Sequence, residues 1–185
     1  MRVIPTRIAD VKIFEPTVIG DERGYFFESF KATTFAEAVG HPPEFVQDNQ
    51  SMSRRGVLRG IHYQVGDTAQ GKLVRVTRGS VFDVAVDLRR HSGTFGQWVG
   101  VELTAENRRQ LWVPRGFGHA FLVLSDEAEF QYKVDAYWSC EDERSIAWND
   151  PDLAIEWPGI DREHPPILSQ KDAEAVRFRD ADVFA

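Results

Sequence analysis

Short runs of alternating hydrophobic and polar residues, separated by turn signals, cover most of the chain. Such runs have the period of strands with one face on a core, and they are too short for most helices. Residues typical of turns lie between them, as in Gly20–Gly24 and Arg78–Ser80. The pattern therefore predicts an all-β fold, either a closed antiparallel barrel or a jelly roll. The runs are Val11–Phe14, Tyr25–Phe30, Lys72–Thr77, Val81–Leu88, Trp98–Leu103, Gln110–Val113, His119–Leu124 and Glu129–Trp138.

Two short helices are expected at the periphery. Thr34 and Glu37 have the spacing of a capping box, and Gly40 supplies a stop signal. Ser169 and Asp172 have the same spacing before Ala173–Phe178.

Composition narrows the class of protein. A length of 185 residues suits a single domain, residues 1–185, with a sizeable core. A net charge of -7 argues against broad binding to nucleic acid or to an anionic membrane. The single cysteine, Cys140, has no partner for an internal disulfide, and the longest apolar run, Ala120–Leu124, is too short to cross a bilayer. Because the N-terminus also lacks a signal-peptide core, we expect a cytoplasmic protein.

The candidate chemistry centres on His62 and Lys72, which flank a short link between two strand-like runs. Histidine titrates near neutral pH and can accept a proton from carbon, and a lysine can stabilise the negative charge that results. Lys72 has the same strand parity as Val74 and Val76, so its ammonium group is expected to point into the domain. A structural histidine and a solvated lysine are the alternative interpretation.

A metal site is the first chemistry to test, because histidines in β-barrels often bind metals. Cupin-type sites need a His-x-His pair, a carboxylate and a later histidine. Here the pair position reads His62-Tyr63-Gln64, so the second imidazole is absent, and His119 alone could serve as the later ligand. This ligand set is poor, and the chain carries no glycine-rich nucleotide fingerprint. We therefore expect neither a metal nor an organic cofactor.

Proton abstraction next to a carbonyl is the second chemistry. It requires a base, a cation at the carbonyl oxygen and an acid on the opposite face. His62, Lys72 and Tyr132 have the right types for these roles. Tyr132 lies in the middle of its predicted strand on the apolar face, where a core tyrosine with one hydrogen bond is the commoner situation.

At this point the residues show a resemblance to a known family. The chain resembles the dTDP-4-dehydrorhamnose 3,5-epimerases from about Asp10 to Asp172. Any one motif is weak, but all of them occur in order and at ordinary spacing. The matching segments are Asp21–Glu28, Phe45–Ser51, Leu58–Gln64, Gln70–Val74, Asp83–Arg89, Trp112–His119, Tyr132–Lys133 and Trp148–Pro151.

The resemblance implies a cupin-like jelly roll, a homodimer without metal, and a dTDP-linked 4-keto-6-deoxyhexose as substrate. The implied reaction inverts C3 and C5 of dTDP-4-dehydro-6-deoxy-D-glucose through an enolate, giving dTDP-4-dehydro-L-rhamnose. By motif match, His62 would be the base, Tyr132 the acid and Lys72 the group that stabilises the enolate oxygen. Asp172 resembles the carboxylate that pairs with the catalytic histidine, although helix capping explains it equally well.

The resemblance also implies a set of substrate-binding residues. Arg59 and His119 would contact the diphosphate or the sugar, and Gln47 and Asn49 other polar groups of the ligand. Three residues of the first motif would contact the nucleotide, often across the dimer: Arg23, Phe26 and Glu28. Glu143 and Lys171 match further binding positions in less distinctive surroundings.

Two departures from the family pattern leave alternatives open. Ala120 replaces a usual glycine after His119, and Trp138-Ser139-Cys140 replaces a tyrosine-and-proline pattern. Related enzymes that act at one carbon differ near the second position. The alternatives are a C3-only or C5-only epimerase, a related ketoisomerase, and a metal-dependent cupin enzyme.

Overall fold

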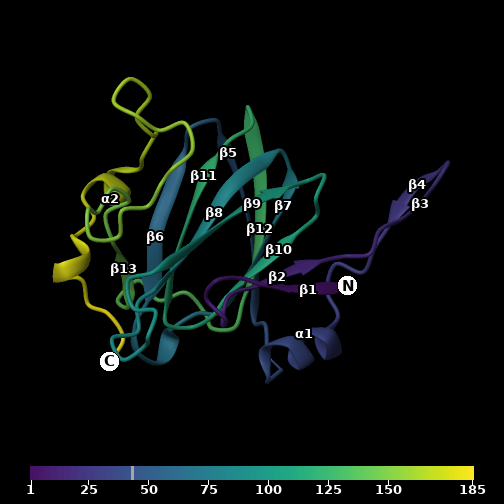
Figure 1. Ribbon diagram of the computed structural model, residues 1–185, viewed down its shortest axis with the longest axis horizontal. Coiled ribbons are helices and arrows are strands. Elements are labelled where there is room, and N and C mark those ends of the chain that lie inside the picture. The colour runs from purple at the N-terminus through teal and green to yellow at the C-terminus, as the bar shows by residue number, and fades with distance from the viewer. Residues whose placement is uncertain (43) are drawn as a thin grey trace.

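Two antiparallel β-sheets face each other and form the body of the protein (Figure 1). The structure is a computed structural model that describes residues 1–42 and 44–185. The first sheet has six strands in the order β1-β2-β10-β7-β12-β5. They span Arg2–Pro5 (β1), Lys12–Glu15 (β2), Gln110–Val113 (β10), Lys72–Arg78 (β7), Glu127–Val134 (β12) and Gln47–Arg54 (β5).

The second sheet has five strands in the order β13-β6-β11-β8-β9. They span Glu143–Ser145 (β13), Leu58–Gln64 (β6), Phe117–Val123 (β11), Ser80–Asp87 (β8) and Trp98–Thr104 (β9). A separate hairpin of β3 (Ile19–Asp21) and β4 (Gly24–Phe26) projects away from the body in Figure 1. The expected all-β jelly-roll fold is thus confirmed.

Three apolar clusters hold these layers together. The cluster between the sheets includes Val74, Val76, Phe121 and Phe130. A second cluster lies behind the five-stranded sheet, where the C-terminal segment covers it. A third lies outside the six-stranded sheet, where α1 (Ala32–Val39) covers it. Both faces of the central strands are therefore buried, and polar side chains between the sheets stand out as candidates for function.

The helices differ in detail from the sequence prediction. α1 begins after Lys31, which makes no side-chain cap, so the predicted capping box at Thr34 is wrong, whereas Gly40 does end the helix in a left-handed conformation. α2 spans only Gln170–Ala173 and is capped by Ser169 as predicted. The predicted continuation to Phe178 is wrong. Short 3₁₀ helices lie at Gly66–Thr68 and Phe178–Asp180.

Two predicted strands are shorter than expected. Pairing in the N-terminal hairpin ends at Phe26 instead of continuing to Phe30, and β12 ends at Val134 instead of Trp138. The chain leaves β12 at Asp135 because it crosses there from the six-stranded sheet to β13 of the five-stranded sheet. Period-two patterning continues through this crossing segment, so the pattern alone did not reveal where the strand ends.

Candidate active site

His62 and Asp172 form a close pair although they lie far apart in the sequence. Strand β6 carries His62, and α2 carries Asp172. Nε2 of His62 lies 2.5 Å from Oδ1 of Asp172, whose side chain is almost fully buried. The side chain of His62 remains 27% exposed. The histidine therefore keeps an open side while its other side is fixed by a buried carboxylate.

Asp172 also belongs to the cap of α2. Ser169 Oγ donates to its Oδ2 (2.7 Å), and the Asp172 backbone N–H donates to Ser169 Oγ (3.1 Å). The backbone N–H of Gly60 donates to Oδ1 (3.3 Å). Burial alone would raise the pKa of Asp172, but the hydrogen bonds from His62 and Ser169 outweigh it and hold this pKa below its usual value. One carboxylate thus binds the hydroxyl of the helix-capping serine and contacts the histidine.

Lys72 lies on the inner face of the six-stranded sheet. It shares this face with Val74 and Val76, which belong to the cluster between the sheets, as its parity predicted. Burial lowers the pKa of Lys72 to about 8, against the opposing effect of the negative charges on Glu143 and Asp83. Its ammonium group is therefore a partly buried charge within the field of two carboxylates, rather than a solvated surface lysine.

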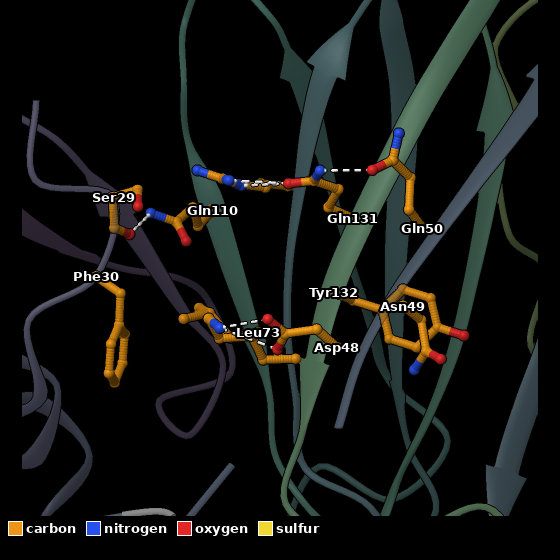
Figure 2. Close-up of a pocket in the computed structure, with 11 residues that line it drawn as sticks. Ser29, Phe30, Asp48, Asn49, Gln50, Leu73, Gln110, Gln131 and Tyr132 are labelled. Carbon is orange, nitrogen blue, oxygen red and sulfur yellow. Dashed lines mark hydrogen bonds and ion pairs between the residues drawn. The ribbon is translucent and has the colours of Figure 1, made fainter. Parts of the chain in front are cut away.

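Tyr132 lies on the same inner face. It pairs with Val74 on one side and with Asn49 on the other, so it is a diagonal neighbour of Lys72. Figure 2 shows the side chains of Tyr132 and Asn49 pointing away from Ser29 and Phe30 on the outside of the sheet. Burial raises the pKa of the Tyr132 phenol, and the positive charge of Arg59 partly offsets this effect. The phenol is a protonated donor at neutral pH.

His119 is held by a carboxylate that the sequence analysis did not select. Its Nε2 lies 3.1 and 3.0 Å from the two carboxylate oxygens of Asp83, and both residues are buried. His119 also pairs with His62 across β11 and β6. Burial raises the pKa of Asp83, while His119 and Lys72 lower it. The sequence contains a signal for Asp83. Its parity along β8 is that of Val81 and Ala85 on the inner face, opposite to that of Phe82 and Val84.

Further predicted residues gather around this group. Arg59 donates from Nε to Ser53 Oγ (3.1 Å), and its charge acts on Tyr132. Gln47 donates to Asn49 Oδ1 (2.8 Å) on β5. Lys171 Nζ lies 2.5 Å from Glu143 Oε2, and both charges act on Lys72. These five predicted residues therefore lie around Tyr132, Lys72 and the His62–Asp172 pair, with Gln47 and Asn49 placed there by the pairing of β5 with β12.

The first matching segment, Asp21–Glu28, does not join the residues around His62, Lys72 and Tyr132 within a single chain. Arg23 forms an exposed ion pair with Asp21, 2.5 Å apart, and Phe26 is 66% exposed. Glu28 is exposed as well. Among the described residues, no hydrogen bond or ion pair joins these three to the other predicted site residues.

The two departures from the family pattern have different surroundings. Ala120 packs in the cluster behind the five-stranded sheet, so its methyl group faces away from His119 and the inner face. Trp138 lies on the segment after β12 and is exposed.

The described residues form no group of three or more His, Cys, Asp or Glu side chains that could hold a metal ion. Within residues 1–42 and 44–185, the helices are too short or too polar to span a membrane.

A cavity of about 380 Å³ lies on the outer face of the six-stranded sheet (Figure 2). Tyr132 and Asn49 border it, but their side chains point away from Ser29 and Phe30, which line its other side. The reactive groups instead lie between the sheets. There an imidazole of the five-stranded sheet contacts a buried carboxylate of α2, and an ammonium and a phenol come from the six-stranded sheet. This arrangement is suited to removing a proton from carbon, stabilising the resulting oxyanion and returning the proton from the other side.

Comparison with known proteins gives a consistent result. Residues 5–180 match the family described as dTDP-4-dehydrorhamnose 3,5-epimerase. The chain is 59% identical over 184 residues to the dTDP-4-dehydrorhamnose 3,5-epimerase of Pseudomonas aeruginosa, covering 100% of this chain and 99% of the relative. It is 39% identical over 181 residues to the dTDP-4-dehydrorhamnose 3-epimerase of Streptomyces niveus, covering 98% and 86%.

A solved structure is similar over the same length. The dTDP-6-deoxy-D-glucose-3,5-epimerase of Legionella pneumophila, solved with dTDP-4-keto-L-rhamnose, superimposes with a TM-score of 0.92 at 52% identity, covering 98% of this chain and 94% of that one. The inner-face side chains, the jelly-roll sheets and these full-length similarities lead to one conclusion: the chain belongs to the dTDP-4-dehydrorhamnose 3,5-epimerase family, whose members are isomerases.

Proposed function

We propose that the chain converts dTDP-4-dehydro-6-deoxy-D-glucose to dTDP-4-dehydro-L-rhamnose by inverting C3 and C5. The observation that carries this proposal is the pair formed by His62 of the five-stranded sheet and Asp172 of α2, together with Lys72 and Tyr132 on the inner face of the six-stranded sheet. Full-length identity of 59% to a 3,5-epimerase supports the same reaction. Lower identity, 39%, to a 3-epimerase makes single-carbon inversion the less favoured alternative.

The first step removes a proton from carbon. A ketone at C4 acidifies the hydrogens on both C3 and C5. Neutral His62 accepts the proton, the C–H electron pair moves into an enolate, and the Asp172 carboxylate stabilises the imidazolium that forms. Because only one side of His62 is occupied by Asp172, the exposed side is available to the substrate.

The second requirement is to stabilise the enolate and to reprotonate it from the opposite face. The Lys72 ammonium acts on the C4 oxygen, a contact worth about 3 kcal/mol by analogy with one oxyanion-hole donor. Tyr132 donates its phenolic proton to the carbon, and its raised pKa keeps that proton in place at neutral pH. The proposal invokes no metal and no organic cofactor, since these side chains supply base, acid and cation.

The remaining predicted residues bind the substrate away from the reacting carbons. We assign Arg59, His119, Gln47, Asn49, Glu143 and Lys171 to the diphosphate, sugar and other polar groups. Arg23 and Phe26 lie on the projecting hairpin and Glu28 follows it, so we assign these three exposed residues to the nucleotide site of a second copy in a homodimer. The protein would act as one domain in the cytoplasm.

One experiment tests the reaction. We expect dTDP-4-keto-6-deoxyglucose in deuterated water to give a product with deuterium at C3 and C5, with both centres inverted, as followed by NMR. His62→Ala should abolish incorporation, and Tyr132→Phe should stop inversion while leaving some exchange. Incorporation at one carbon would indicate a single-position epimerase, and a carbonyl moved to C3 a ketoisomerase. Stoichiometric bound metal with chelator-sensitive activity would contradict the proposed mechanism.

A further inference from the structure

Two segments cross between the sheets at the same end of the molecule. Residues 65–71 connect β6 to β7, and residues 135–142 connect β12 to β13. Strands β6 and β13 belong to the five-stranded sheet, and β7 and β12 to the six-stranded sheet. Each segment therefore links a strand of one sheet to a strand of the other.

The side chain of Gln64 joins the two segments. It is 3% exposed, and its Nε2 donates to the backbone oxygens of Thr68 (2.6 Å) and Tyr137 (3.1 Å). Its Oε1 accepts from the backbone N–H of Ser139 (2.8 Å). Both amide hydrogens and the carbonyl oxygen are thus used, which fixes the orientation of the amide.

Further hydrogen bonds continue this connection along both segments. We call residues 64–71 and 135–142, joined in this way, the loop clasp. Its other contacts are Gln70 Nε2 to Ala136 O (2.8 Å), Gly71 N to Asp135 Oδ1 (2.7 Å), Thr68 Oγ1 to Asp142 Oδ2 (2.8 Å) and Val65 N to Asp142 O (3.1 Å).

Each end of the loop clasp lies next to a residue of the proposed reaction. His62 is two residues before Gln64, and Lys72 follows Gly71 directly. Tyr132 lies three residues before Asp135, and Glu143 follows Asp142. The loop clasp therefore connects the strand of the base, His62, to the strands of the cation, Lys72, and of the acid, Tyr132.

We propose that Gln64 is a positioning residue, which acts through the loop clasp to fix the spacing between His62 on one sheet and Lys72 and Tyr132 on the other. This inference rests on the proposed function. Proton removal needs His62 in place, whereas inversion also needs Tyr132 at the opposite face of the same carbon. A loosened clasp should therefore impair inversion more than exchange, because a shift of about 1 Å in a reacting group can cost about 100-fold in rate.

The test compares Gln64→Met with Gln110→Met. Gln110 is also buried, at 4% exposure, and donates to Ser29 O (2.5 Å), but it lies on β10, away from the clasp. For Gln64→Met we expect inversion to fall by about 10- to 100-fold while deuterium exchange changes by less than about 3-fold. Backbone amides of residues 135–142 should exchange faster with solvent. Gln110→Met should leave the ratio of exchange to inversion and these amides unchanged.

A proportional loss of exchange and inversion in Gln64→Met, or no change in either, would overturn the inference. If this variant does not fold, Thr68→Val removes the hydroxyl that contacts Asp142 and Val65 and should shift the ratio in the same direction by a smaller factor. An unchanged ratio in Thr68→Val would then overturn it. Failure of the wild-type protein to incorporate deuterium would instead contradict the proposed function and not the role of the clasp.

Discussion

The orientation or pKa of each ionisable side chain in the proposed reaction depends on a different feature of its surroundings. His62 is oriented by a carboxylate that a serine and a backbone amide hold in turn. Lys72 is partly buried, which lowers its pKa, and Glu143 and Asp83 offset part of that decrease. Burial raises the pKa of the Tyr132 phenol. The base, the cation and the acid therefore differ in protonation because their surroundings differ, as proton transfer in both directions requires.

The lowered pKa of Lys72 predicts an alkaline limit to activity. The enolate needs a cation, and Lys72 loses its proton as the pH rises through about 8. We expect kcat/KM to decrease above about pH 8. Lys72→Arg should be slower than the wild type but should not lose activity above about pH 8, since arginine stays charged. Lys72→Met should be slow at every pH. A pH–rate profile for each protein tests this, and an unchanged decrease in Lys72→Arg would assign it to another group.

The double role of Asp172 can be separated by two substitutions. Asp172→Asn keeps the size of the side chain but removes the charge that supports the imidazolium, so we expect kcat to decrease by about 10²- to 10⁴-fold. Ser169→Ala removes the helix cap, costs about 1 kcal/mol of stability and keeps the carboxylate near His62. Its kcat should stay within about 10-fold of the wild-type value. Steady-state kinetics with thermal unfolding measure both effects. Equal losses of kcat in the two variants would mean that the cap, not the charge, matters.

At the scale of elements, β6 and β11 approach so closely that one position between them must be glycine. Gly60 has φ +119°, and a Cβ there would lie 2.5 Å from the backbone oxygen of His119 and 2.6 Å from the Ala120 methyl. The backbone oxygen has no freedom to rotate away. This contact brings the strand of His62 against the strand of His119, and it also explains how Ala120 is accommodated: its methyl occupies the space that Gly60 leaves.

Gly60→Ala should therefore be strongly destabilising. Backbone strain and overpacking together predict a loss of about 2–4 kcal/mol in the free energy of unfolding. Gly93→Ala is the matched control, because a Cβ there meets no atom within 4 Å, and it should change stability by less than about 1 kcal/mol. Urea unfolding measures both. A Gly60→Ala protein as stable as the control would show that the two strands can separate.

The strands were largely predictable because their alternation is local, but their ends and partners were not. The parity of Lys72 placed it correctly, whereas β12 was extended to Trp138 because alternation continues past the turn at Asp135. The link between Asp172 and His62 spans 110 residues of sequence, so only the family resemblance suggested it. Asp83 was overlooked because both faces of β8 are buried. The more apolar face of this strand points away from the other sheet, so hydrophobicity alone did not show which face lies between the sheets.

At the scale of the whole molecule, the body and the hairpin make different contributions. The reactive groups are enclosed by two sheets of one chain, whereas Ile19 and Phe26 on the hairpin are each 66% exposed, and the hairpin extends from the body in Figure 1. Exposed apolar side chains on a projecting arm are typical of a contact with another protein. Arg108, between β9 and β10, packs over the rings of Tyr25 and Phe27 and so connects the arm to the body. A second copy of the chain is the partner that our proposal requires.

Mixed dimers test whether the hairpin completes the site of its partner. His62→Ala and Arg23→Ala proteins, unfolded and refolded together, should form hybrids in which an intact Arg23 faces an intact His62. Random pairing of equal amounts makes half of the dimers hybrids with one complete site each, so about a quarter of wild-type activity should return. A mixture of His62→Ala and Tyr132→Phe should recover none, because both residues serve the site of their own chain. If Arg23 acts on its own chain, the first mixture will be no more active than its two components measured separately.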